Sequence, residues 1–320
     1  GNLQKIAATL AAEPRTSDLV VFSELFLVGY PPRDLLEKPG LIRQVQEALE
    51  HLMELSARYP ATGILVGAPQ PTGRDIGKGL CNCAVLIYQG QVRLRQAKSL
   101  LPTYDVFDET RHFDPAGEVT VLTFKDEVLG VSICEDAWYD PELWFRRLYS
   151  LDPIQTQAGR GATVLINISA SPFQVGKEEV RHRLFQCHAR KYGIPLVYVN
   201  QVGGNDELIF DGRSQALDRA GEAIAVLPGF REAVVTADLT QAGVPGRYRP
   251  EEKIATVNEA LVLGLRDYLG KCGFKQAVVG LSGGVDSAVT CCLAVAALGR
   301  ENVLGVLMPS PYTSRESIDD

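Results

Sequence analysis

Residues 131–138 have the sequence Val131-Ser132-Ile133-Cys134-Glu135-Asp136-Ala137-Trp138. An apolar run over 128–133 leads into this stretch, so the sequence predicts a buried strand with Cys134 at its tip. Strand ends on a rigid scaffold are common positions for chemically active side chains. A free thiol is mostly protonated near neutral pH, so a nucleophilic Cys134 would need a base and a field that favours the thiolate.

Short apolar runs alternate with longer segments of helical period on both sides of Cys134, which is the pattern of an α/β protein. Regularity is expected to stop after 233–235, because Gly243, Pro245, Gly246 and Pro250 then interrupt any helix. We therefore expect a first domain over 1–240, a linker over 241–256 and a second domain over 257–320. The expected strands lie at 19–22, 64–66, 84–88, 128–133, 164–168 and 196–199, and the expected helices at 41–58, 178–192 and 257–272.

The composition excludes several classes of function. The chain has 320 residues, 46% hydrophobic and 22% charged, which suffices for one large core and part of a second. The net charge of -7 gives no basic surface for nucleic acid, and apolar stretches such as 162–168 are far shorter than the ~20 residues of a membrane helix. We therefore expect a cytoplasmic protein that binds neither nucleic acid nor a membrane.

The seven cysteines are an odd number without a Cys-x-x-Cys pair, and only four histidines accompany them. This pattern predicts neither a disulfide framework nor a zinc site. Cys81 and Cys83 flank Asn82 at the start of an apolar run, where small buried strand residues are the simplest interpretation. The same interpretation holds for Cys291 and Cys292.

Glu24 and Lys98 are candidates for the base and the field that Cys134 needs. Glu24 follows the expected strand at 19–22, and Lys98 lies beside another apolar strand, so both could reach a cluster at the strand ends. A carboxylate can take the thiol proton and pass it to leaving ammonia, while a lysine and backbone N–H groups stabilise the oxyanion. Spacing alone does not select these two residues from the other glutamates and lysines of the chain.

Three motifs contain these residues, in this order along the chain: Glu24-Leu25 with Gly29-Tyr30-Pro31-Pro32, Lys98 with Pro102, Tyr104 and Phe107-Asp108-Glu109, and Ile133-Cys134-Glu135-Asp136. Together they resemble the nitrilase superfamily. The resemblance implies a four-layer αββα sandwich with Glu24 as general base, Lys98 as oxyanion stabiliser and Cys134 as nucleophile. It also implies that the Glu135 N–H helps to hold the oxyanion and that Glu109 orients the lysine. A surface ion pair with a neighbouring arginine is the alternative for Glu109.

Two further stretches narrow the resemblance: Gly29-Tyr30-Pro31-Pro32-Arg33-Asp34-Leu35-Leu36 and Asn167-Ile168-Ser169-Ala170-Ser171-Pro172-Phe173. They are similar to the glutaminase domain of glutamine-dependent NAD synthetases, over nearly all of residues 1–240. This resemblance implies that Tyr104, Ser171 and Lys177 bind the substrate glutamine through hydroxyls and a cation suited to its carboxylate and amine ends. The alternative for Lys177 is a solvated lysine at a helix start. Nitrilase-like domains usually pair through a shared face, so a homo-oligomer is also implied.

A second motif, Ser282-Gly283-Gly284-Val285-Asp286-Ser287, lies between an apolar run at 277–281 and a helical segment. Glycines allow close backbone approach, and N–H groups at a helix start with two serine hydroxyls suit an anionic pyrophosphate. No lysine follows the glycines, so the motif is not a Walker loop. An ordinary glycine-rich turn capped by Asp286 or Ser287 is the alternative.

The motif resembles the loop of the ATP pyrophosphatases, and residues 308–314 after the expected strand at 303–307 resemble the NAD synthetase domain. The resemblance implies a doubly wound α/β domain of the adenine-nucleotide alpha-hydrolase type, truncated at Asp320, in which Asp286 binds Mg²⁺. Because the first strand of a nitrilase fold is also missing before Asn2, we expect a fragment. The implied ATP-binding residues are Gly280, Leu281, Ser282, Gly283, Gly284, Val285, Asp286 and Ser287.

The two resemblances together imply a ligase that combines both reactions. Glutamine hydrolysis would supply ammonia for the ATP-dependent amidation of nicotinic acid adenine dinucleotide to NAD, with release of AMP and pyrophosphate. Two alternatives are a stand-alone nitrilase-type amidase with a remnant nucleotide-binding domain and an inactive ligand-binding module.

Overall fold

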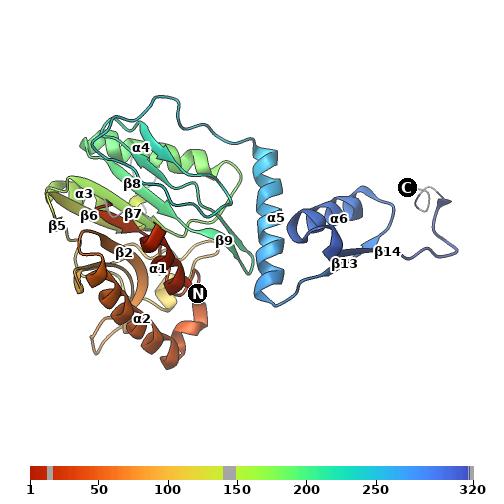
Figure 1. The fold of residues 1–320 in the computed structure, drawn as a ribbon, viewed down its shortest axis with the longest axis horizontal. Coiled ribbons are helices and arrows are strands. Elements are labelled where there is room, and N and C mark those ends of the chain that lie inside the picture. Colours follow the sequence, from red (N-terminus) through yellow and green to blue (C-terminus); the bar gives the residue numbers. More distant parts are fainter. Residues whose placement is uncertain (13–16, 140–148, 316, 318–320) are drawn as a thin grey trace.

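The computed structural model describes residues 1–12, 17–139, 149–315 and 317. Two β-sheets lie face to face and helices cover the outer side of each, so the larger part of the chain is a four-layer αββα sandwich (Figure 1). This confirms the predicted fold class. The first sheet contains, in spatial order, β1 (Leu19–Val21), β2 (Gly63–Pro71), β3 (Leu80–Tyr88) and β4 (Gln91–Ala97). The second contains β12 (Ala223–Val226), β11 (Gln215–Leu217), β8 (Leu196–Asn200), β7 (Val164–Ser169), β6 (Glu127–Ile133) and β5 (Leu122–Phe124).

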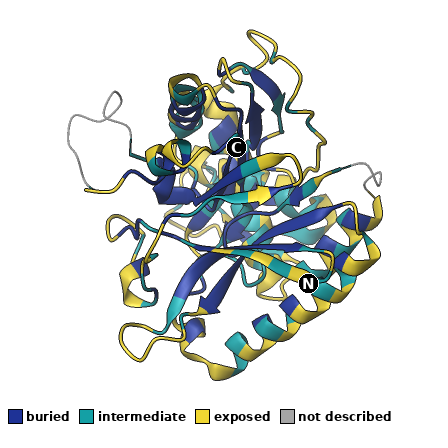
Figure 2. Ribbon diagram, turned by 90° about the vertical axis from the view of Figure 1, so that its left-hand side faces the viewer, coloured by how far each residue is buried: buried dark blue, intermediate teal, exposed yellow. Residues whose placement is uncertain are grey.

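Helices α1 (Asn2–Ala12) and α2 (Pro39–Arg58) cover the first sheet, and α3 (Pro153–Gly159) and α4 (Lys177–Tyr192) cover the second. Strands β2 and β7 are buried almost throughout, which explains their continuous apolar sequences. Figure 2 shows these buried strands inside a more exposed shell of helices and loops. The two sheets pack against each other through Leu65, Leu86, Val131, Ile166 and Ile168. The space between the first sheet and its helices contains Ile6, Leu49, Val66 and Val85. The space between the second sheet and its helices contains Leu165, Phe185, Ala189 and Leu196.

The direction of the strands brings three loops to one edge of the second sheet. Strands β6, β7 and β8 are parallel, with Val131 opposite Ile166 and Ile166 opposite Val197. The segments that follow their carboxyl ends are therefore neighbours, and this edge is where open α/β sheets usually bind ligands. Three short 3₁₀ helices lie in the loops of the sandwich: η1 (Arg33–Glu37), η2 (Glu109–Arg111) and η3 (Cys134–Ala137).

A small hairpin and a long helix lead out of the sandwich. The hairpin pairs β9 (Val202–Asn205) with β10 (Leu208–Asp211), and α5 (Lys253–Lys271) packs on it through Ala260 and Leu263. Helix α5 begins at Lys253, inside the segment predicted as a linker and before the expected helix start at 257. It lies between the sandwich and the remaining elements (Figure 1).

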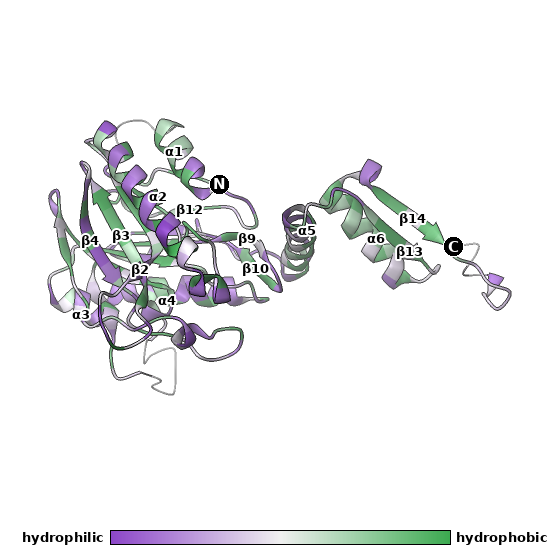
Figure 3. Cartoon of the chain, turned by 90° about the horizontal axis from the view of Figure 1, so that it is seen from below, coloured by the Kyte–Doolittle hydropathy of each residue, from purple (hydrophilic) through white to green (hydrophobic). Residues whose placement is uncertain are grey.

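The remaining elements form a parallel βαβ unit. Strand β13 (Ala277–Leu281) pairs with β14 (Val303–Leu307), and α6 (Val285–Leu298) with η4 (Arg300–Asn302) connects them. This unit is the building block of doubly wound sheets. Figure 3 shows the apolar β13 and β14 beside α6. Among the described residues, no helix combines the length and the apolar character that a bilayer crossing requires.

Candidate active site

Cys134 lies immediately after β6 and opens η3, as the sequence predicts for a strand end. Its φ is 43°, a left-handed conformation that is uncommon for a residue other than glycine and often occurs at functional sites. Asp136 holds this turn, because one carboxylate oxygen accepts from the Ile133 N–H at 3.0 Å. The other oxygen accepts from the N–H groups of Ser99 and Leu100 at 2.9 and 2.8 Å, which ties the turn to the segment after Lys98.

Lys98 lies between two buried carboxylates. Its Nζ is 2.8 Å from Oε1 of Glu24 and 2.6 Å from Oε1 of Glu109. All three side chains are withdrawn from solvent, with exposed fractions of 0% for Glu24, 1% for Lys98 and 5% for Glu109. Glu109 therefore faces the buried lysine, whereas the neighbouring Arg111 pairs with Asp34 at the surface.

Two residues that sequence reasoning missed, Asn82 and Tyr30, complete the hydrogen bonding of these carboxylates. The Asn82 amide donates to Glu24 Oε1 at 2.7 Å, and the Ala170 N–H donates to the other oxygen at 2.8 Å. The Tyr30 hydroxyl donates to Glu109 Oε1 at 2.8 Å. Asn82 is a polar residue inside the apolar run of β3, and this position could have indicated its role from the sequence. Buried polar side chains almost always form hydrogen bonds with a partner.

The electrostatics of the cluster keep the resting thiol protonated. Burial, together with the charge of Glu24, raises the pKa of Cys134 well above its usual range, although Lys98 opposes this shift. Burial alone would lower the pKa of Lys98, but the charges of Glu109 and Glu24 outweigh it and raise that pKa. Burial also raises the pKa of Glu109. A charged lysine and a neutral thiol are thus the stable pair, and a nucleophilic sulfur forms only as its proton is removed.

The three residues expected to bind glutamine lie on separate segments around η3. Tyr104 is 47% exposed, and its hydroxyl donates to Glu135 Oε2 at 2.8 Å. Tyr149, which sequence reasoning missed, donates to the other oxygen of Glu135 at 2.9 Å. Both carboxylate oxygens of Glu135 are therefore held by tyrosines.

Ser171 and Lys177 flank the loop that follows β7. Ser171 is buried, and its N–H donates to the Asn200 side chain at 2.8 Å. Lys177 begins α4, where its Nζ lies 5.4 Å from the centre of the Trp138 ring. Burial lowers the pKa of Lys177, and the nearby Arg181 lowers it further. Lys177 is thus partly buried against an aromatic ring and is not a freely solvated lysine.

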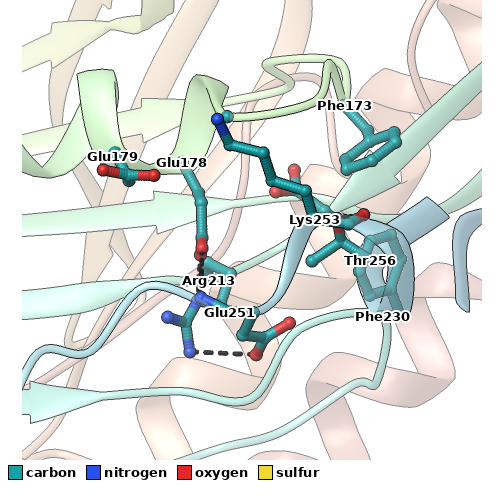
Figure 4. Close-up of a pocket in the computed structure, with 10 residues that line it drawn as sticks. Phe173, Glu178, Glu179, Arg213, Phe230, Glu251, Lys253 and Thr256 are labelled. Carbon is teal, nitrogen blue, oxygen red and sulfur yellow. Dashed lines mark hydrogen bonds and ion pairs between the residues drawn. The ribbon is translucent and has the colours of Figure 1, made fainter.

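The start of α5 is fastened to α4 beside this loop (Figure 4). Arg213 donates to Glu178 Oε2 at 2.7 Å and lies 3.1 Å from Glu251 Oε1. The Glu251 N–H donates to the other oxygen of Glu178 at 2.7 Å. A small space of about 10 Å³, also lined by Phe173 and Lys253, lies at this junction. The segment that precedes the βαβ unit is therefore connected to the helix that Lys177 opens.

Residues 280–287 form the turn from β13 into α6. Gly283 has a φ of +77°, and a Cβ there would lie 2.3 Å from the Ser317 carbonyl oxygen, so only glycine fits. The hydroxyls of Ser282 and Ser287 lie 3.2 Å apart across the turn. Asp286 is exposed in the first turn of the 14-residue α6. One exposed carboxylate beside a glycine-rich turn would suit Mg²⁺, which usually takes one or two carboxylates together with phosphate oxygens and water.

The family model described as carbon–nitrogen hydrolase matches residues 1–246. The chain belongs to this family. A second family model, described as NAD synthase, matches residues 257–320. These matches confirm the two resemblances inferred from the sequence.

Full-length relatives carry both parts. The glutamine-dependent NAD(+) synthetase of Synechocystis is 45% identical over 328 residues, covering 100% of this chain and 58% of the relative. The synthetase of the same name from Thermotoga maritima is 37% identical over 361 residues, covering 100% of this chain and 59% of the relative. The chain thus spans somewhat less than two thirds of the length of these curated relatives.

Solved structures agree with the fold. A glutamine-dependent NAD+ synthetase from Acinetobacter baumannii superposes with a TM-score of 0.88 at 33% identity, over 99% of this chain and 58% of that one. A nitrilase-superfamily amidase from Nesterenkonia superposes with a TM-score of 0.59 at 25% identity, over 71% of this chain and 80% of that one. The sandwich is therefore shared with simple amidases, and the part after it is shared with the synthetases.

Proposed function

We propose that this chain hydrolyses glutamine at Cys134 as part of a glutamine-dependent NAD(+) synthetase, a carbon–nitrogen ligase. The observation that carries the proposal is the buried Lys98 between Glu24 and Glu109, next to a cysteine in a strained turn. This arrangement supplies a nucleophile, a proton acceptor and a cation in a site without bulk water. The full-length similarity to synthetases supports the coupling to synthesis.

In the proposed reaction, Cys134 Sγ attacks the side-chain amide carbon of glutamine while Glu24 takes the thiol proton. Lys98 and the Glu135 N–H stabilise the negative oxygen of the tetrahedral intermediate. The C–N bond then breaks, Glu24 returns the proton to the leaving ammonia, and a thioester remains. Glu24 next takes a proton from the water that attacks the thioester. The C–S bond then breaks, glutamate leaves, and Glu24 returns the proton to the sulfur. Glu109 acts as a positioning residue, because it acts on the reaction through Lys98 and, more weakly, through Asn82 at 3.5 Å.

The substrate glutamine is proposed to lie between Tyr104, Ser171 and Lys177. Lys177 provides the cation for the α-carboxylate, and the hydroxyls provide hydrogen-bonding groups for the polar ends of the amino acid. The pKa of Lys177 is lowered chiefly by burial, which fits a lysine that gains an anionic partner when the substrate binds.

The second half of the proposal concerns residues 280–287. This turn is proposed to bind the phosphates of ATP, with Gly283 and Gly284 allowing close approach and Asp286 holding Mg²⁺. The Acinetobacter baumannii relative was solved in complex with ADP, which supports a nucleotide site in this family of structures. ATP would adenylate the carboxylate of nicotinic acid adenine dinucleotide and release pyrophosphate. Ammonia from Cys134 would then displace AMP.

The partners and location follow from the same proposal. Glutamine, ATP and nicotinic acid adenine dinucleotide are the proposed substrates. A homo-oligomer and a cytoplasmic location remain predictions from the resemblance and the composition.

Two parallel assays on the intact protein test this function. NAD formation is measured from nicotinic acid adenine dinucleotide, ATP and Mg²⁺, with glutamine in one tube and ammonium in the other. We expect NAD in both tubes. If neither tube forms NAD while glutamine is still converted to glutamate, the protein is an amidase and the synthetase half of the proposal fails.

A further inference from the structure

Two thiols lie in contact on the strand that supports the proposed catalytic cluster. The Sγ atoms of Cys81 and Cys83 are 3.3 Å apart on β3, and both cysteines are free. Alternate residues of a strand point to the same face, so the two thiols share the face toward α1 and α2 while Asn82 points toward the opposite one. The spacing of about 6.6 Å between alternate Cα atoms of a strand lies at the upper end of the range of disulfide-bonded cysteines. The same repeat separates the two Cβ atoms by about 6.6 Å, more than the roughly 3.5–4.5 Å of a disulfide, so β3 must bend locally for the bond to form.

Asn82, between the two thiols, is attached to both charged partners of Cys134. Its side-chain amide donates to Glu24 Oε1 at 2.7 Å, and its backbone carbonyl oxygen accepts from the Lys98 backbone N–H at 2.8 Å. Its exposed fraction is 0%. Any local bend of β3 at this point therefore moves the proposed base and the proposed oxyanion stabiliser together.

We propose that Cys81 and Cys83 form an oxidation site whose disulfide displaces Asn82 and lowers glutamine hydrolysis. To form the bond, the sulfur atoms must approach from 3.3 Å to about 2.05 Å. The neighbouring strands β2 and β4 are paired to β3 at this point, with Ala68 and Ala97 opposite Cys83. These pairings oppose a shift of the whole strand, so the proposal places the movement within residues 81–83. This inference adds a control to the proposed glutaminase and rests on that function for its effect on rate.

The two thiols differ in pKa, which suits an oxidation that begins at one of them. The hydrogen bond from Cys83 lowers the pKa of Cys81, and that same bond raises the pKa of Cys83. Cys81 is the more exposed of the two, at 9% against 3% for Cys83, and lies nearer along the chain to the exposed turn at 73–78. Cys81 is thus the thiol that reacts first, because the thiolate is the reactive form.

With a peroxide as oxidant, the Cys81 thiolate attacks one peroxide oxygen, and the O–O bond breaks to give a sulfenic acid and water. The Cys83 sulfur then attacks the Cys81 sulfur, the S–O bond breaks, and the second oxygen leaves as water with the Cys83 proton. Two thiols and one peroxide thus give one disulfide and two waters. A thiol reductant reverses the step by exchange.

The test uses the intact protein and diamide, an azo oxidant that takes two hydrogens from a thiol pair and becomes a hydrazine. Both cysteines fall in one tryptic peptide, residues 79–93, so the disulfide appears as the loss of two hydrogens and of reactivity toward iodoacetamide. We expect this modification together with a fall of about 10²-fold in glutamine hydrolysis, the effect of a displacement of about 1 Å in a catalytic group. Dithiothreitol should restore the rate, and ammonia-dependent NAD formation should not change.

The matched control is Cys83→Ala, which keeps the other six cysteines, Cys134 included. Its glutamine hydrolysis should resist diamide, with Cys83→Ser as the substitute if the alanine variant does not fold. The absence of the disulfide in peptide 79–93 would overturn the proposal. So would a disulfide without loss of rate, or an equal loss in the variant. If the untreated protein hydrolyses no glutamine, the proposed function fails, and the peptide map still decides whether the thiol pair is an oxidation site.

Discussion

At the scale of single residues, Lys98 compensates the negative charges of the buried cluster. It is the cation between Glu24 and Glu109, which would otherwise be two like charges shielded from water. Removing one partner of a buried ion pair leaves an uncompensated charge and is strongly destabilising. The folded protein would then favour a proton on one of the carboxylates.

Lys98→Met should therefore lower the free energy of unfolding by about 3–5 kcal/mol and glutamine hydrolysis by about 10²–10³-fold. Urea denaturation and a glutamate-release assay measure the two effects. Lys5→Met removes a lysine that is 52% exposed and pairs with Glu232, so its cost should stay within about 1 kcal/mol. Equal stability of the two variants would contradict the assigned role of Lys98.

Asp136 predicts a pH dependence of stability. Burial raises the pKa of its carboxyl group to about 7 from the ordinary 3.8, although three N–H groups oppose the shift. Between these two values the folded protein keeps a proton that the unfolded chain has lost. The stability contribution is therefore fully present below pH ~4 and is lost as the pH rises toward ~7.

Asp136→Asn removes this titration. The free energy of unfolding of the wild type minus that of the variant should fall between pH 4 and 8, by at most about 4 kcal/mol at 1.36 kcal/mol per unit of pKa. Denaturation at several pH values measures the difference. A difference that stays constant with pH would show that Asp136 does not titrate in this way.

At the scale of elements, β2 passes so closely to the Glu24 segment that only glycine fits at Gly67. A Cβ there would lie 2.2 Å from the Leu25 nitrogen and 2.5 Å from the Ser23 carbonyl oxygen. Gly67→Ala should cost about 1–3 kcal/mol of stability and, by moving Glu24, reduce glutamine hydrolysis by about 10²-fold. Gly159→Ala in α3 meets no atom within 4 Å and serves as the control in thermal unfolding and activity assays. Unchanged activity in Gly67→Ala would contradict this account of how Glu24 is placed.

The sequence predicted the strands that are buried on both faces and the strand ends that carry a recognisable motif. The apolar runs of β2, β3, β6, β7 and β8 predicted those strands, whereas β4 was missed because its exposed and half-buried residues alternate and form no continuous apolar run. The run at 233–235 is exposed and forms no strand, because no neighbouring strand pairs with it in the described structure. The position of Asn82 inside an apolar run indicated a buried polar role. The partners of Asn82 and Asp136 were not predictable from local pattern, because the fold brings them from distant segments.

At the scale of the whole molecule, α5 connects the sandwich to the βαβ unit. Its first residues are held by Arg213, which is 11% exposed and contacts both Glu178 and Glu251. Arg213→Leu leaves these two carboxylates without their shared cation, so the start of α5 should detach more often. Hydrogen exchange of residues 251–256 should become faster.

The control for this prediction is Arg183→Leu, on the exposed face of α4, where the arginine is 69% exposed. Its exchange at 251–256 should match the wild type. Equal exchange in both variants would contradict the role of Arg213 and leave the other contacts of α5, those of Ala260 and Leu263 among them, to hold the helix in place.

The central claim is that glutamine hydrolysis and synthesis use two separate sites in one molecule. The most direct measurement is NAD formation by intact Cys134→Ala protein, with glutamine or with ammonium as the nitrogen source. We predict that the variant forms no NAD from glutamine and forms it from ammonium at the rate of the wild type. Loss of both activities in a variant that still folds, or NAD formation from glutamine without Cys134, would contradict the account.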